Sequence, residues 1–246
     1  MILQETVKRI IGIRGRLLIR RFYPKRWRIS KHYQRAFRGM QCLEIGGPSE
    51  ILGDKGPLPL YSWLAEIDNC NFAEQTIWSS DSVIYSRTFI VEGTALEIES
   101  SSYDGAIACH CLEHIANPIK ALREWRRVLR PHGILLLILP HRDHTFDWRR
   151  PVTTIEHMKK DYDTDMPESD LTHLDEILSL HDLSRDPRAG TPEQFRDRCL
   201  NNTKFRAIHH HVFAPQAAME ILQESGFSVV RQDVVEGNIL SLGRSN

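Results

Sequence analysis

Four polar side chains that could exchange protons follow two apolar stretches of the chain, 103–109 and 134–139. These candidate catalytic residues are His110, His141, Asp143 and His144. Histidine suits general acid–base chemistry because its ordinary pKa, about 6.5, lies close to neutrality. The sequence does not choose among the four, and for each of them a role as a surface or packing residue stays open.

A glycine turn follows the apolar segment 41–45. Gly46 and Gly47 would let a ligand approach the backbone, and a following helix would offer its free N–H groups. The spacing is not the G-x-G-x-x-G of dinucleotide-binding proteins. Asp68 follows at roughly the twenty-residue offset at which a carboxylate binds ribose hydroxyls. Each signal alone is equally compatible with a tight turn that binds nothing.

Clusters of histidine and cysteine raise the question of a metal site. The HExxH motif is absent, and His209, His210 and His211 are adjacent, so their side chains must point in different directions. In a strand, Cys109 and Cys111 would lie on one face, where packing beside a ligand is favoured over metal ligation. We therefore expect no metal site.

Apolar strand-like segments alternate with helical patterns along much of the chain. The expected strands are 41–45, 63–67, 88–91, 103–109, 134–139, 227–235 and 239–242, and the expected helices outside the polar stretch are 119–129, preceded by Pro118, and 215–225. Such alternation predicts βαβ units and a mostly parallel sheet. Residues 141–205 are polar, with helical patterns at 153–162, 171–180 and 192–200, and we expect them to form an insertion over the carboxyl edge of the sheet.

Four motifs occur in a fixed order between residues 41 and 139. They are LEIGG at 43–47, ID at 67–68, YDGAIACHCLEHI at 103–115 and RVLRPHGILL at 127–136. Together they resemble the class I S-adenosylmethionine-dependent methyltransferases, in particular the type 11 branch. The resemblance implies a Rossmann-like α/β fold. This fold has a mostly parallel seven-stranded sheet with helices on both faces, a closing antiparallel hairpin and a helical insertion after the fifth strand.

The same resemblance implies S-adenosylmethionine as the cofactor. The expected cofactor-binding residues are Glu44, Gly46, Gly47, Pro48, Asp68, Asn69, Thr94, Ala95, Leu96, Cys109 and His110. Two features depart from the family pattern. The glycines of the loop are adjacent, and residues 94–96 lack the acid that often lies beside the adenine, so backbone and apolar groups are expected there.

Methyl transfer requires an acceptor held in line with the methyl group and, for an oxygen acceptor, a base. The polar and aromatic insertion favours a hydroxylated acceptor, and the fuller pattern resembles enzymes that modify polysaccharides. We predict O-methylation of a sugar, a glycan or another small hydroxylated molecule, in polysaccharide biosynthesis. The alternatives are a non-catalytic scaffold that kept the fold and, less favoured without G-x-G-x-x-G, a nicotinamide-dependent oxidoreductase.

The formal net charge of zero is the sum of two opposite parts. Residues 1–38 carry 12 basic residues and one acidic residue, a net of +11, and residues 39–246 carry the other 20 basic and 31 acidic residues, a net of −11. We predict a basic helical arm over 1–38 and a methyltransferase domain over 39–246. The arm could rest on the acidic domain or contact an anionic membrane. Nucleic acid is an unlikely partner because the acidic domain would repel phosphates.

Compartment is predicted from what the sequence lacks. No apolar run approaches the roughly 20 residues that span a bilayer, and the first residues do not resemble a secretory signal. The 5 cysteines form no CxxC pair and do not suggest a disulfide framework. We predict a cytoplasmic protein, with peripheral membrane contact through the arm left open.

Overall fold

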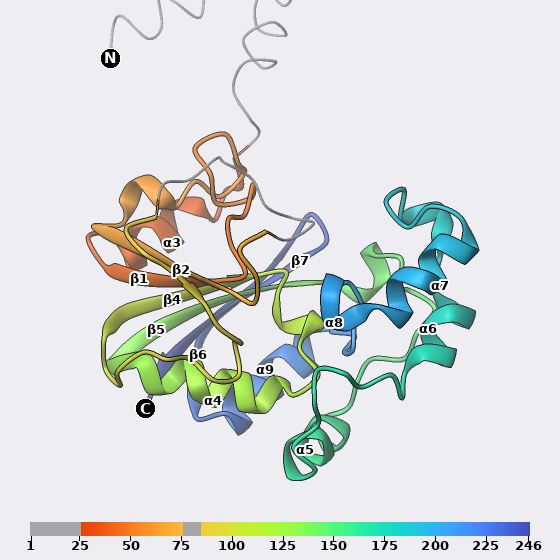
Figure 1. The fold of residues 1–246 in the computed structure, drawn as a ribbon. Coiled ribbons are helices and arrows are strands. Elements are labelled where there is room, and N and C mark those ends of the chain that lie inside the picture. Colours follow the sequence, from red (N-terminus) through yellow and green to blue (C-terminus); the bar gives the residue numbers. More distant parts are fainter. Residues whose placement is uncertain (1–25, 76–84) are drawn as a thin grey trace, which may run out of the picture. The chain divides into compact units, whose positions relative to one another are not determined.

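The computed structural model describes residues 26–75 and 85–246 (Figure 1). Residues 1–25 of the helical arm expected over 1–38 lie outside the described residues. Among those described, residues 26–39 and 49–64 form one compact unit, and residues 40–48 together with those from 65 onward form a second. Residues 49–64 were predicted as part of the methyltransferase domain. In the structure they belong to the same compact unit as residues 26–39.

The smaller unit contains helix α3 (Ser30–Phe37) and the short 3-10 helix η1 (Tyr61–Trp63). Tyr33 and Phe37 lie one turn apart on α3 and are fully buried. Gln34 Nε2 donates a hydrogen bond of 2.8 Å to the Pro59 carbonyl, and Ser30 Oγ donates one of 2.9 Å to the Pro57 carbonyl. These bonds attach the helix to the loop that belongs to the same unit.

The larger unit is built on a seven-stranded sheet in the order β3-β2-β1-β4-β5-β7-β6. The strands are β1 (Gln41–Ile45), β2 (Glu66–Asn71), β3 (Thr88–Ile90), β4 (Tyr103–Cys109), β5 (Leu129–Pro140), β6 (Phe227–Val235) and β7 (Asn238–Ser245). The first five pair in parallel, whereas β7 is antiparallel to both β5 and β6. The predicted mostly parallel sheet with a closing antiparallel hairpin is confirmed.

Two strands differ from the sequence prediction in their bounds. β2 was expected at 63–67 but runs from Glu66 to Asn71, because backbone pairing with β1 and β3 carries it through the polar residues that follow Ile67. β5 begins five residues before the expected Ile134. The strand starts early because Leu129 already pairs with Tyr103 of β4. The register between β4 and β5 then shifts before Ile134, in the turn that contains His132 with a φ of 65°.

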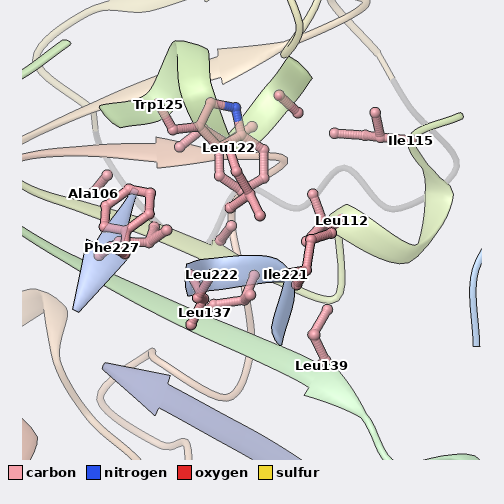
Figure 2. Packing of buried hydrophobic residues seen from close by; sticks show 14 of the residues in the cluster. Ala106, Leu112, Ile115, Leu122, Trp125, Leu137, Leu139, Ile221, Leu222 and Phe227 are labelled. Carbon is pink, nitrogen blue, oxygen red and sulfur yellow. The ribbon is translucent and has the colours of Figure 1, made fainter. Parts of the chain in front are cut away.

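Helices α4 (Pro118–Val128) and α9 (Pro215–Glu224) cover one face of the sheet. Trp125 of α4 and Ile221 of α9 belong to one apolar cluster with Leu137 and Leu139 of β5 (Figure 2). α4 begins as predicted, with Pro118 in its first turn and the Asn117 side chain accepting a hydrogen bond from the Lys120 N–H. The cap and the apolar stripe together fix where this helix starts and which side it buries.

The predicted insertion consists of short helices with an apolar cluster of their own. They are η3 (Arg142–His144), α5 (Ile155–Asp163), α6 (Leu174–Leu180), η4 (Leu183–Arg185), α7 (Pro192–Leu200) and α8 (Asn202–Phe205). The cluster contains Ile177, Phe195, Cys199 and Ile208. Across the described ranges 26–75 and 85–246, no helix combines the length and apolar character needed to cross a bilayer.

Candidate functional site

A cavity lies where the carboxyl ends of the parallel strands meet the insertion. It encloses about 630 Å3 of space, part of it open to solvent. Its lining residues are Ile45, Gly46, Cys70, Asn71, Phe72, Val91, Glu92, Gly93, His110, Cys111, His114, Ile115, Glu168 and Arg206. The strand order reverses between β1 and β4, and the edge beside such a reversal is where open α/β sheets bind ligands.

The glycine loop after β1 needs residues without side chains. Gly46 has a φ of 79°, and a Cβ there would lie 2.8 Å from Cys111 Sγ. A Cβ at Gly47 would lie 2.4 Å from a carboxylate oxygen of Glu44 and 2.5 Å from the Tyr85 hydroxyl. These two groups are joined, because Tyr85 donates a 2.6 Å hydrogen bond to the fully buried Glu44. Gly46 lines the cavity; Glu44 and Gly47 support the loop behind it.

The second strand presents a different residue from the one predicted. Asp68 lies in the middle of β2, not at its end, and is 1% exposed. Its Oδ2 accepts hydrogen bonds from Arg87 Nη2 at 2.7 Å and from the Tyr103 hydroxyl at 2.7 Å. Asn71 ends the strand, lines the cavity and donates a 2.8 Å hydrogen bond to the Gly47 carbonyl.

Of the remaining cofactor candidates, few lie on the cavity. Pro48, Asn69 and Cys109 are not among its lining residues, and Val91, Glu92 and Gly93 take the place expected for 94–96. Leu96 is instead buried, and its N–H donates to Glu124 Oε1. A carboxylate, that of Glu92, also lines the cavity two residues before the segment 94–96.

An arginine from the insertion joins two acids at the cavity. Arg206 Nη2 donates a 2.6 Å hydrogen bond to Glu92 Oε1, and its Nη1 forms an ion pair with Glu168. Arg206 has a φ of 47° and ends α8. Burial is the largest influence on Glu168 and raises the pKa of its carboxyl, although the charge of Arg206 opposes this. The cavity is therefore polar and charged on the insertion side.

His110 is the one predicted catalytic residue that lines the cavity. Its Nε2 lies 2.7 Å from Asn238 Oδ1, while Asn238 Nδ2 donates to the carbonyls of Val235 and Glu236. Because the amide nitrogen is used in this way, the amide oxygen faces the ring and must accept a hydrogen bond from the Nε2–H group. Nδ1 of the neutral ring then carries the lone pair and can accept a proton.

The other three catalytic candidates do not line the cavity. Asp143 is bound by Arg142, whose Nε lies 2.9 Å from Asp143 Oδ1. His141 Nδ1 accepts a hydrogen bond from the Asp143 N–H, and the ring of exposed His144 packs edge-on against that of His141. Of the four candidates, His110 is therefore the one that the cavity includes.

A buried group of acids and histidines lies behind the cavity. His114, which lines the cavity, packs edge-on against His209 with ring centroids 4.6 Å apart. His209 Nδ1 lies 2.6 Å from Asp147 Oδ2. Burial tends to raise the pKa of Asp147, but His209 and Arg150 outweigh it and lower the value to about 2. Burial raises the pKa of Glu113.

Two groups within the described residues bring metal-ligating atoms to within 4.8 Å of one another. One is Glu113, His114 and His209, and the other is His157, Asp161 and His211. Sequence reasoning did not find either group, since their members come from segments far apart in the chain.

Comparisons with known proteins agree with this fold and site. A family model described as a methyltransferase domain matches residues 65–137. A search among curated proteins found no match. Many solved structures share the fold, and we describe two of them.

One is the Burkholderia thailandensis 1,6-didemethyltoxoflavin-N1-methyltransferase, bound to 1,6-didemethyltoxoflavin and S-adenosylhomocysteine. It is 13% identical with a TM-score of 0.51, over 89% of this chain and 77% of that one. The other is from a complex of the Haloferax volcanii Trm112 methyltransferase activator with a protein assigned as a methyltransferase. It is 12% identical with a TM-score of 0.50, over 90% of each chain.

At these identities the two structures establish the fold, and the family model matches the part of the sheet from β2 to β5. Both agree with the class I methyltransferase fold that the sequence predicted. The cofactor of this class is S-adenosylmethionine. The cavity fits it in two respects: the backbone at Gly46 is open to close approach, and Asn71 and Glu92 offer polar groups at neighbouring strand ends.

Proposed function

We propose that this protein transfers a methyl group from S-adenosylmethionine to a hydroxyl group of a sugar, a glycan or another small hydroxylated molecule. His110 carries the proposal, because it lines the cavity directly after β4 and its Nε2 is bound to Asn238, which leaves Nδ1 as the acceptor nitrogen of the neutral ring. Such a nitrogen can take the proton that an acceptor oxygen must lose. When bound, S-adenosylmethionine supplies an electrophilic methyl group.

The residues divide the cavity into two sides. Gly46, Asn71 and Glu92 lie at or just after the ends of β1, β2 and β3 and would hold the cofactor. His110 and Arg206, which follows the insertion, would face the acceptor. His110 Nδ1 would take the proton of the acceptor hydroxyl as the methyl group leaves the sulfur of the cofactor for the oxygen, which would leave S-adenosylhomocysteine as the second product. The main task of the protein is to hold acceptor and methyl in line.

A hydroxylated acceptor is favoured by the groups on the insertion side. Glu168 and Arg206 offer carboxylate and guanidinium groups that could bind hydroxyls by charge-assisted hydrogen bonds. A reducing cytoplasm is the compartment we propose, because none of the 5 cysteines, all of them described, forms a disulfide. A contact of the N-terminal arm with anionic membranes stays a prediction.

The test separates cofactor binding from methyl transfer. Calorimetry with S-adenosylhomocysteine should give binding for the wild type and for His110→Asn, which tolerates the φ of 49° at this position. With labelled methyl donor and extracts of the host cell, the wild type should label the carbohydrate fraction and His110→Asn should not. His144→Ala, an exposed histidine away from the cavity, is the matched control and should keep both activities.

Three outcomes would count against parts of the proposal. Label in RNA or protein would exclude the hydroxylated small acceptor. Unchanged transfer by His110→Asn would exclude His110 as the base. Cofactor binding without transfer to any fraction would favour the non-catalytic alternative.

A further inference from the structure

We propose that the insertion binds a divalent cation of the zinc type through His157, Asp161, His173 and His211. This inference goes beyond the methyl-transfer proposal and does not depend on it. It also departs from our expectation from the sequence that the chain has no metal site.

The four side chains converge from three separate segments. His157 and Asp161 lie one turn apart on α5, His173 immediately precedes α6, and His211 comes after α8. His157 Nε2 lies 3.1 Å from His173 Nε2 and 3.4 Å from Asp161 Oδ2. His211 Nε2 lies 3.8 Å from the same carboxylate oxygen.

These separations are close to those around a tetrahedral ion. With metal–nitrogen bonds of about 2.0–2.1 Å, neighbouring ligand atoms of a tetrahedral zinc lie roughly 3.4 Å apart. The ligand atoms of His157, Asp161 and His211 all lie within 4.8 Å of one another, and His173 adjoins this group through His157. Three of the ligand–ligand distances, 3.1, 3.4 and 3.8 Å, lie on both sides of the tetrahedral value. Three imidazoles and one carboxylate suit Zn2+ better than Mg2+ or Ca2+, which favour oxygen ligands.

Polar atoms that lack a hydrogen bond point to a missing partner. Asp161 is 3% exposed, and within the described chain its Oδ2 is buried without a hydrogen bond. His211 Nε2, the nitrogen on the Asp161 side, also lies 3.3 Å from the Ala116 carbonyl. A buried carboxylate oxygen without a partner is costly. A cation between Asp161 and the imidazoles would remove that cost.

The adjacent histidines have other partners, which explains why only one of the three joins the group. His209 is held by Asp147. Asn202 Oδ1 accepts the N–H groups of Ala207 and Ile208, so Asn202 Nδ2 must donate to His210 Nε2 at 3.2 Å. The three side chains do point in different directions, as expected, and His211 alone is directed toward Asp161.

A closed set of four protein ligands is typical of a structural metal. The ion would tie α5, the start of α6 and residue 211 together. The backbone N–H of His211 also donates to the Glu113 carbonyl, next to the cavity residue His114. Metal binding would therefore stabilise the insertion beside the cavity without taking part in methyl transfer.

The test measures metal content of the full chain without a histidine tag. After chelator treatment, reloading with Zn2+ and desalting, elemental analysis should find about one zinc ion per wild-type chain. Two variants, Asp161→Asn, which preserves the size of the side chain, and His173→Ala, should bind zinc at least about tenfold more weakly than the wild type. Removal of a residue that only supports a metal ligand already costs about tenfold in affinity. The Co2+-loaded wild type should show the visible absorption of tetrahedral coordination.

His132→Asn is the matched control. It removes an exposed histidine from a turn with a φ of 65°, a conformation that asparagine tolerates, and it should bind zinc like the wild type. His209→Ala tests the other group. Zinc that stays in Asp161→Asn but is lost in His209→Ala would overturn the proposal, as would a wild type that retains no zinc and gives no tetrahedral Co2+ spectrum. Binding of S-adenosylhomocysteine, measured on the same samples, reports separately on the methyl-transfer proposal.

Discussion

The glycine loop allows a sharp prediction for Gly46→Ala. Alanine at a φ of 79° leaves its preferred backbone region, which costs about 1–2 kcal/mol. Its methyl group would also lie 2.8 Å from Cys111 Sγ and 3.1 Å from Cys111 Cβ. Cys111 packs against the main apolar cluster, so the neighbour cannot move away freely.

The magnitude follows from adding these contributions. Forcing a methyl group into a packed site costs about 1–3 kcal/mol, and the lower flexibility of alanine in the unfolded chain gives back about 0.4–1 kcal/mol. Gly46→Ala should therefore lower the free energy of unfolding by about 1–5 kcal/mol. If the folded protein instead shifts the loop, the affinity for S-adenosylhomocysteine should fall at least tenfold.

Urea unfolding and calorimetry would measure the two effects. Gly93→Ala is the matched control, since Gly93 lines the same cavity and its added Cβ would meet only ordinary contacts, 3.5 Å from Ile115 and 3.6 Å from Ile45. It should change stability by less than about 0.5 kcal/mol. Cys111→Ala combined with Gly46→Ala should recover part of the loss, because it removes the closest atom. The reasoning fails if Gly46→Ala matches the wild type in both measurements.

Three further predictions concern other parts of the chain. Burial would raise the pKa of Asp186, but its hydrogen bonds and ion pairs, including one of 3.0 Å with Arg198, outweigh burial and lower the pKa from 3.8 to about 2. Asp186→Asn should therefore lower the free energy of unfolding at pH 7 by about 2 kcal/mol. This difference from the wild type should shrink as the pH falls from 4 toward 2, where the carboxylate becomes protonated. A pH-independent difference in chemical denaturation would contradict this. Thr191→Ala removes the capping box of α7 and should lower the free energy of unfolding by about 1 kcal/mol in the same assay. A variant as stable as the wild type would contradict this. Deletion of residues 1–25, which keeps buried Trp27, should leave the affinity for S-adenosylhomocysteine unchanged but weaken co-sedimentation of the protein with anionic vesicles. Equal co-sedimentation of the two forms would exclude the membrane role of the arm.

The sequence predicted elements best where burial is visible as periodicity. β4 and α7 match their expected bounds, and α4 and α9 differ by a residue, because apolar spacing, proline and capping residues all indicate the same ends. β2 was misplaced since its second half is polar. Asp68 is buried by partners that come from outside the strand, Arg87 and Tyr103, and a strand pattern contains no information about them.

The site was predicted less completely than the fold. Gly46 and His110 were found because motifs mark the ends of their strands. Arg206 lies 114 residues from Glu92, its partner at the cavity, and no local pattern connects them. The choice of His110 among the four catalytic candidates also required the third dimension, because Asn238 decides the tautomer of its ring.

The segment 209–211 has a consequence for how this chain can vary. Its three side chains serve three separate networks through Asp147, Asn202 and Asp161. The next residue anchors the segment, with the Thr153 N–H bonded to the Val212 carbonyl at 2.9 Å. A deletion or insertion of one residue would rotate every histidine into the position of its neighbour and disable all three networks at once. Substitutions here would act one network at a time, whereas changes in length would not be tolerated.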